Sequence, residues 1–93
     1  MSEYRSYLTI PEMIDQCVVD VKNRGFNTTS AIDQVAEFFG VTPRSVKEYV
    51  YYGKETGNRD AIYQRYLDHL THEEQAVTRK LASIRARIKQ AQQ

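Results

Sequence analysis

One stretch, IDQVAEFFGVTPRSVKEYVYY at residues 32–52, constrains this chain most, because it specifies two short helices joined by a tight turn. Its first half repeats apolar residues at three- and four-residue spacing, which predicts one buried helix face. Gly40 is expected to end this helix, since glycine adopts the left-handed cap conformation without a steric penalty. Thr42 and Pro43 then suit the N-cap and the first residue of the next helix.

The pattern resembles the helix-turn-helix of DNA-binding regulators. The resemblance rests on small Ala36 at the helix crossing, Gly40 at the chain reversal, apolar Val41, and inward-facing Val46 and Tyr49. It implies that the second helix enters the major groove of DNA, where side chains near its start meet base edges. The alternative is an ordinary helical hairpin within a bundle.

The resemblance implies a recognition helix over residues 43–52. Arg44 is the candidate for a bidentate contact to guanine, and Lys47, one turn on, is placed to reach a base or a phosphate. Glu48 either accepts a hydrogen bond from cytosine or steers Arg44. Hydroxyl groups and the polar connection after the helix would supply phosphate contacts. The expected DNA-binding residues are Thr42, Arg44, Ser45, Lys47, Glu48, Tyr51, Lys54 and Arg59.

The segment VTPRSVKEYVYYG also resembles the MerR family, in which a Ser/Thr-Pro-Arg start leads to paired tyrosines and a glycine. It departs from that family in having a full helix ahead of the motif and no recognisable wing. A small phage- or plasmid-type regulator, with a three-helix reader and a helical oligomerisation tail, fits the length better.

The residues ahead of the motif predict a further helix. Two helices alone cannot enclose a core, so a third helix must cover their open side. This helix is expected to start at Thr9 or Ile10 and to end at the glycine stop of Gly25. Cys17 lies on its apolar face, and we expect a buried thiol there. The helix-turn-helix unit is therefore expected to span residues 1–59.

Two segments beside these helices are predicted to be irregular. Residues 1–8 are expected to form a tail. Residues 26–30, FNTTS, are expected to form a polar loop. Ser30 and Asp33 then resemble a capping box for the first helix of the motif.

The last third of the chain, residues 60–93, is predicted to be a helical oligomerisation extension, either a helical hairpin or a coiled coil. Its apolar residues alternate steps of three and four, which is a heptad seam. Thr71 and Glu74 resemble a capping box, which predicts a break and a final helix from about His72 to Gln90. Pairing with a second copy is slightly favoured over packing on its own domain. The expected seam residues are Leu67, Leu70, Val77, Leu81, Ile84 and Ile88.

Composition limits the class of protein. The chain has 93 residues, of which 41% are hydrophobic and 27% charged, which is normal for a soluble globular protein of one domain, or of one small domain with an appendage. The helical patterns above predict an all-α fold. No apolar run approaches the roughly 20 residues that cross a bilayer, and a single cysteine suits the reducing cytoplasm. No nucleophile, base and acid gather in the sequence. His69 and His72 lack the spacing of a metal site and are expected in a solvated turn between helices. We therefore expect no enzyme, cofactor or metal.

Charge is distributed unevenly along the chain. The formal net charge is only +1, yet residues 1–40 carry −3, whereas residues 75–93 carry five basic groups and no acidic one. Such a division allows a nearly neutral chain to have one face for nucleic acid. One small reader would bind weakly, so we expect a homodimer or higher oligomer that reads an inverted repeat with half-sites about one helical turn apart.

These observations predict a small dimeric regulator of transcription whose partner is double-stranded DNA. One alternative is a DNA-binding accessory protein for packaging or plasmid maintenance, which ring-like oligomers would favour. Another is a protein-binding inhibitor or adaptor that uses the same fold without DNA, which the low net charge and the acidic first helix favour.

Overall fold

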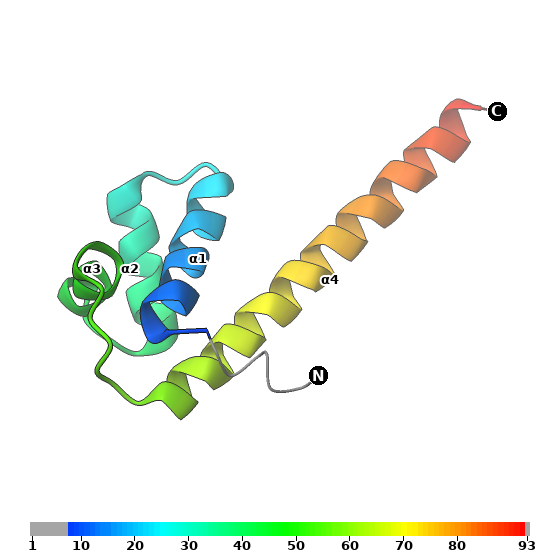
Figure 1. Ribbon diagram of the computed structural model, residues 1–93. Helices are drawn as coiled ribbons and strands as arrows, with labels where there is room; N and C mark the ends of the chain where they lie inside the picture. The colour runs from blue at the N-terminus through cyan, green and yellow to red at the C-terminus, as the bar shows by residue number, and fades with distance from the viewer. Residues whose placement is uncertain (1–7, 93) are drawn as a thin grey trace.

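The computed structural model describes residues 8–92. These residues form four helices and no strand: α1 (Ile10–Asn23), α2 (Thr28–Phe39), α3 (Pro43–Tyr52) and α4 (Arg59–Ala91). The predicted all-α class is confirmed, with three short helices in a compact unit and one long C-terminal helix after them (Figure 1). Apart from Leu8, which packs against the core, the tail expected over residues 1–8 lies outside the described residues.

Helix α1 begins with a capping box, one residue after Thr9. The Thr9 hydroxyl accepts from the Glu12 backbone amide at 3.2 Å, and the Glu12 carboxylate accepts from the Thr9 amide at 2.8 Å. This backbone hydrogen bond lowers the pKa of the Glu12 carboxyl. Pro11 lies in the first turn, where its missing N–H has no cost. The predicted start of the helix is therefore confirmed.

Helix α2 begins earlier than predicted. Its N-cap is Asn27, whose side-chain oxygen accepts from the Ser30 backbone amide at 2.8 Å. The predicted loop over residues 26–30 and the predicted capping box of Ser30 and Asp33 are therefore wrong. The earlier start adds a turn of helix and places Ala31 in the core with no exposed surface.

The turn between α2 and α3 has the predicted geometry. Gly40 has φ +70° and ends α2 in the left-handed conformation. The Thr42 side chain caps α3 by accepting from the Ser45 backbone amide at 3.0 Å. Gly53, with φ +65°, ends α3 in the same way as Gly40 ends α2. Local turn chemistry thus fixes both ends of α3.

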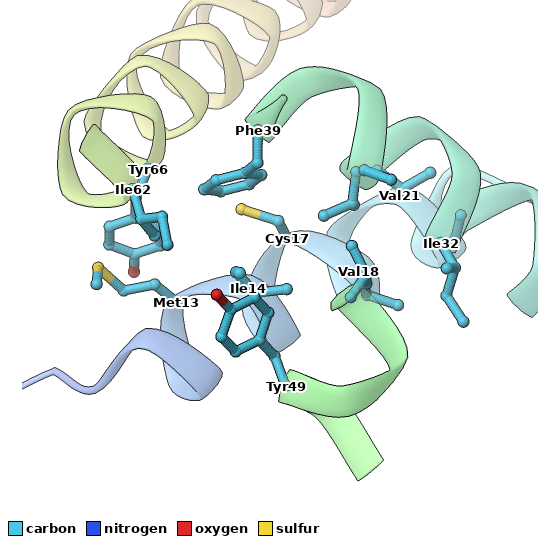
Figure 2. Packing of buried hydrophobic residues seen from close by; sticks show 14 of the residues in the cluster. Met13, Ile14, Cys17, Val18, Val21, Ile32, Phe39, Tyr49, Ile62 and Tyr66 are labelled. Atoms are coloured by element: carbon cyan, nitrogen blue, oxygen red, sulfur yellow. The ribbon is translucent and has the colours of Figure 1, made fainter. Parts of the chain in front are cut away.

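The core lies around α1, which contacts each of the other three helices. Met13, Ile14 and Cys17 on α1 are almost fully buried, as is Val46 on α3. Figure 2 shows side chains of α1 surrounded by residues from the other helices, including Phe39, Tyr49 and Tyr66. The prediction that Cys17 is buried is confirmed, and burial raises the pKa of its thiol to about 12.

Helix α4 is one continuous helix of 33 residues. The predicted break at Thr71 and the hairpin form of the extension are therefore wrong. Instead of capping a new helix, the Thr71 hydroxyl donates to the Leu67 carbonyl of its own helix at 3.0 Å. Nothing in this segment stops a helix, because it contains neither glycine nor proline.

The two halves of α4 have different surroundings. In the first half, Ile62, Tyr66 and His69 are buried, and the Tyr66 hydroxyl donates to the Gln16 side chain on α1. From Glu74 to Gln92 every residue is exposed, and Figure 1 shows this half of the helix projecting away from α1–α3. Within residues 8–92, no helix has the length and apolar character needed to cross a membrane.

Candidate nucleic-acid interface

Helix α3 has one face in the core and the opposite face in solvent. Val46 and Tyr49 hold it against the rest of the domain, with 0% and 4% of their surface exposed. The outer face presents Arg44, Lys47 and Tyr51, all exposed, and the Arg44 side chain is 90% exposed. Two buried side chains thus position a helix whose outer side chains are accessible to a partner.

Two of the hydroxyl groups expected to meet phosphates, those of Thr42 and Ser45, lie at the start of α3. Besides accepting from the Ser45 amide, the Thr42 hydroxyl donates to the Ser45 hydroxyl at 3.1 Å. Both side chains therefore belong to the helix cap. They also lie at the positive end of the helix dipole, where an anion is stabilised.

Glu48 lies between two of the cations expected to bind DNA. Its carboxylate is 3.9 Å from Arg44 Nε, one turn earlier, and 3.3 Å from Lys54 Nζ in the connection that follows the helix. Lys54 Nζ is also 5.2 Å from the centre of the Tyr49 ring. Exposed ion pairs contribute only about 0–1 kcal/mol, so a phosphate can compete with Glu48 for either cation.

The connection from α3 to α4 is held close to α3 by one hydrogen bond. The Tyr49 hydroxyl donates to the Thr56 carbonyl at 2.8 Å. Gly57 follows with φ +143°, and a Cβ atom there would lie 2.6 Å from the Tyr49 hydroxyl oxygen. Arg59 then opens α4 directly after the Asn58 cap and is half-buried. It therefore lies beyond the connection, on α4, whereas the other predicted contacts lie on α3, at its cap or in the connection.

One exposed aromatic residue was absent from the predicted set. Tyr52, the last residue of α3, is 83% exposed, compared with 57% for its neighbour Tyr51. The helical period did not predict this exposure, since Tyr52 lies three residues after the inward-facing Tyr49 and would share its face, whereas Tyr51 would not. Its phenol ring extends the accessible surface of α3 toward the C-terminal end.

The predicted oligomerisation residues follow one side of α4. Leu67 is half-buried beside the domain. The exposed fractions of the other predicted residues range from 37% for Ile84 to 64% for Val77. These side chains form an apolar stripe that continues over the projecting half of α4: Leu70, Val77, Leu81, Ile84 and Ile88.

A polar cluster that the sequence did not predict joins α4 to α1. His69 was expected in a solvated turn, but it is only 7% exposed. Its Nε2 atom is 2.7 Å from the Asp20 carboxylate and 3.8 Å from the Glu73 carboxylate, and Arg24 pairs with Glu73. Asp20 and Arg24 are one turn apart on α1, and His69 and Glu73 are one turn apart on α4. This matching spacing was the only sign of the cluster in the sequence.

The same cluster holds the described residues best placed to bind a metal ion. One ligand atom each from Asp20, His69 and Glu73 lies within 4.8 Å of the others. However, His69 already bonds to Asp20, and Arg24 already neutralises Glu73. We interpret the cluster as an ion-pair contact that fastens α4 to α1.

Beside this cluster, an open groove of about 600 Å³ lies among α1, α2 and α4. Val21, Val35 and Phe38 provide apolar lining, and Arg65 and His72 add polar groups from α4. Cys17 also lines the groove, but a thiol with a pKa near 12 is not ionised at neutral pH. The groove therefore offers no activated nucleophile.

No protein-family model, curated protein or solved structure matches this chain. The resemblances to helix-turn-helix regulators and to the MerR family therefore stay predictions. Only the chain's own residues and their geometry bear on its function.

Proposed function

We propose that this chain is a small DNA-binding protein, a dimeric regulator of transcription that reads the major groove with α3. The observation that carries the proposal is the outer face of α3. A ten-residue helix follows a glycine turn, is anchored by Val46 and Tyr49, and presents exposed Arg44 and Lys47 beside its start. Helices of this size fit the major groove, and arginine is the commonest side chain to recognise guanine there.

The charges around α3 support binding through phosphates as well as bases. Arg44 and Lys54 flank Glu48 in weak surface pairs, and Lys47 adds a third exposed cation on the same helix as Arg44. Three cations predict weak binding by one domain, with a salt dependence set by the number of phosphates that they neutralise. Pairing of two copies through the apolar stripe of α4 would double these contacts.

The proposal is tested by fluorescence anisotropy of a labelled mixed-sequence duplex across a salt series. We expect the logarithm of the association constant to fall linearly with the logarithm of salt concentration. Replacing Arg44 and Lys47 together by alanine should reduce the slope by about 1.8 if both meet phosphates, at about 0.9 per contact. Equal slopes for wild type and the double variant would contradict a role for α3.

A matched control removes the same charge elsewhere. Lys22, in the last turn of α1, and Arg79, on α4, are both exposed. The Lys22→Ala/Arg79→Ala variant has the same net charge as Arg44→Ala/Lys47→Ala. We expect it to bind DNA with the wild-type slope, and an equal loss in both variants would indicate that only overall charge matters.

A protein-binding adaptor is the second candidate, and one observation favours it. Glu48 partly neutralises the outer face of α3 through its contacts with Arg44 and Lys54, while α1 presents exposed Glu12 and Asp15. If no duplex binds even at low salt, the adaptor becomes the better proposal. In that case Asp15→Asn should weaken partner binding and Arg44→Ala should not.

A DNA-binding accessory protein for packaging or plasmid maintenance would use the same face of α3. It differs from the regulator in assembly. A ring of several copies, measured by analytical ultracentrifugation, would favour the accessory role, whereas a dimer favours the regulator.

A further inference from the structure

We infer that α4 pairs with α4 of a second copy in the antiparallel direction, an inference that rests on the dimer of the proposed function. The feature that calls for a partner is the apolar stripe of α4. Val77, Leu81, Ile84 and Ile88 are 37–64% exposed on the half of α4 that projects away from the other described helices (Figure 1). Their alternating three- and four-residue steps match the core positions of a two-stranded coiled coil.

The stripe is accessible without moving α4 from its own domain. The residues that face α1 are Ile62, Tyr66 and His69. With 3.6 residues per turn, the stripe lies about a fifth of a turn around the helix from this buried face. Leu70, beside the buried region, is still 40% exposed. A second helix can therefore lie along the stripe while α1 keeps its contacts.

Charge complementarity decides the direction of pairing. Residues 67–74 contain three acidic groups, of which Glu73 already pairs with Arg24, and no lysine or arginine. Residues 84–91 contain three basic groups and no acidic one. A parallel pair would place each segment beside its own copy, so that like charges meet along both ends. An antiparallel pair places the acidic segment of each copy beside the basic segment of the other, at both ends of the dimer.

Glu74 supports the same direction. It is exposed and occupies a core position in the stripe, between Leu70 and Val77. In a parallel pair in register, Glu74 would face the partner's Glu74 across the seam, and two carboxylates there would repel each other. In the antiparallel pair it can lie beside the partner's Arg85 and the partner's Arg87.

One antiparallel register uses the whole stripe. It places Leu70 opposite the partner's Ile88 and Val77 opposite the partner's Leu81. Glu73 and the partner's Arg87 then flank the seam on the same side. Every predicted oligomerisation residue meets an apolar partner, apart from Ile84, which faces Glu74.

This register also sets the distance between the two domains. Ile62, where α4 first packs on α1, and the partner's Ile62 would be separated by 34 helical positions, or about 50 Å at 1.5 Å per residue. The two α3 helices would then lie at opposite ends of the dimer. The earlier expectation of half-sites one helical turn apart, about 34 Å, gives way to a wider spacing.

Disulfide cross-linking of the full chain tests the direction. We would compare Leu70→Cys alone, Ile88→Cys alone, and an equimolar mixture of the two after exchange and mild oxidation. Wild type is the control, because Cys17 is 1% exposed and should not cross-link. We expect disulfide-linked dimers in the mixture and not in either single variant. Efficient cross-linking of each single variant with itself would overturn the inference in favour of a parallel pair.

A second variant outside the seam is needed, because cysteine at Leu70 or Ile88 removes an apolar side chain that the dimer would pack. Thr78 is exposed and flanks the stripe. In the antiparallel register Thr78→Cys faces the partner's copy of the same residue, whereas in a parallel pair the two lie on opposite sides of the seam. We expect Thr78→Cys to cross-link with itself. If this variant is a dimer by analytical ultracentrifugation and does not cross-link, the inference is overturned.

Failure of the direction is distinguishable from failure of the proposed function. Analytical ultracentrifugation of wild type reports whether a dimer exists, and a monomer at high concentration would overturn both the dimer and its direction. The salt dependence of DNA binding depends on α3 and is measured separately. A parallel dimer that still loses its salt slope on changing Arg44 and Lys47 would leave the DNA proposal intact.

Discussion

The His69 imidazole Nε2 lies 2.7 Å from the Asp20 carboxylate and links α4 to α1 across 49 positions of sequence. Beside it, Arg24 of α1 pairs with Glu73 of α4. His69 is 7% exposed and the Asp20 side chain is 35% exposed, so their bond is partly shielded from water. Together with the buried Tyr66, these contacts fix the direction in which α4 leaves the domain.

Replacing His69 by alanine should destabilise the domain. The change removes the hydrogen bond, leaves Asp20 without its partner and opens space beside Phe38, whose ring centre is 6.4 Å from that of His69. We expect a loss of about 1–3 kcal/mol in the free energy of unfolding, measured by urea denaturation. The exposed neighbour His72 provides the control, and His72→Ala should change the free energy by less than about 0.5 kcal/mol. Equal effects of the two changes would contradict the role of the contact.

Gly57 should be intolerant of a side chain because of Tyr49. A Cβ atom at Gly57 would lie 2.6 Å from the Tyr49 hydroxyl oxygen, and φ at this position is +143°. We expect Gly57→Ala to cost more than about 1 kcal/mol in unfolding free energy. In a Tyr49→Phe background the clashing oxygen is gone, so the same glycine change should cost less. Additive effects in this double-mutant cycle would show that the clash does not matter.

Neutralising Glu48 should strengthen DNA binding if the proposed function is right. Glu48→Gln removes a negative charge between Arg44 and Lys54 and frees both cations for phosphates. We expect an increase in affinity for a mixed-sequence duplex of about two- to fivefold. Asp15→Asn, which makes the same charge change on α1, should have a smaller effect. Weaker binding by Glu48→Gln would instead indicate that the carboxylate itself contacts DNA.

The buried thiol of Cys17 should make stability fall at alkaline pH. Burial raises its pKa from 9.0 to about 12, so the folded state keeps the proton that the unfolded state releases. The stabilisation is therefore complete below about pH 9 and is lost as the pH rises from there toward 12. Between pH 8 and pH 10, the free energy of unfolding should fall by about 1.4 kcal/mol more for wild type than for Cys17→Ala. Parallel pH profiles for the two proteins would refute this.

The projecting half of α4 should be ordered only in the dimer. An isolated helix of this length without tertiary contacts is marginal in water. We expect backbone amides of residues 75–91 to exchange faster with deuterium as the protein is diluted. Amides around Tyr66, which packs on α1, should be insensitive to concentration. Concentration-independent protection of residues 75–91 would contradict pairing through α4.

The helices and turn of residues 28–53 show what local sequence can predict. Gly40 and Gly53 act through the left-handed backbone conformation and Thr42 through its side-chain hydroxyl, so the turn and the ends of α3 followed from three residue types. The start of α2 did not, because Asn27 and Ser30 are both good caps. In the structure Asn27 is the cap, and its side chain accepts from the Ser30 amide.

The polar contacts of α4 depend on tertiary structure that the sequence does not reveal. Thr71 and Glu74 match a capping box, but a capping residue acts only where a helix begins, and here the helix continues. His69 looked solvated because its partner, Asp20, is distant in sequence. The direction in which α4 crosses α1 had to be known before the histidine could be placed beside the carboxylate.

Helix α3 depends on few of its own side chains for its place in the fold. Glycines in the left-handed conformation precede and follow it, and within the helix only Val46 and Tyr49 are buried. Its outer positions can therefore change with little effect on folding. A library that varies Arg44, Lys47 and Tyr51 while keeping Val46 and Tyr49 should consist mostly of folded proteins. Selection from such a library on a chosen DNA duplex would test whether new outer residues give this small domain a new target without redesigning its scaffold.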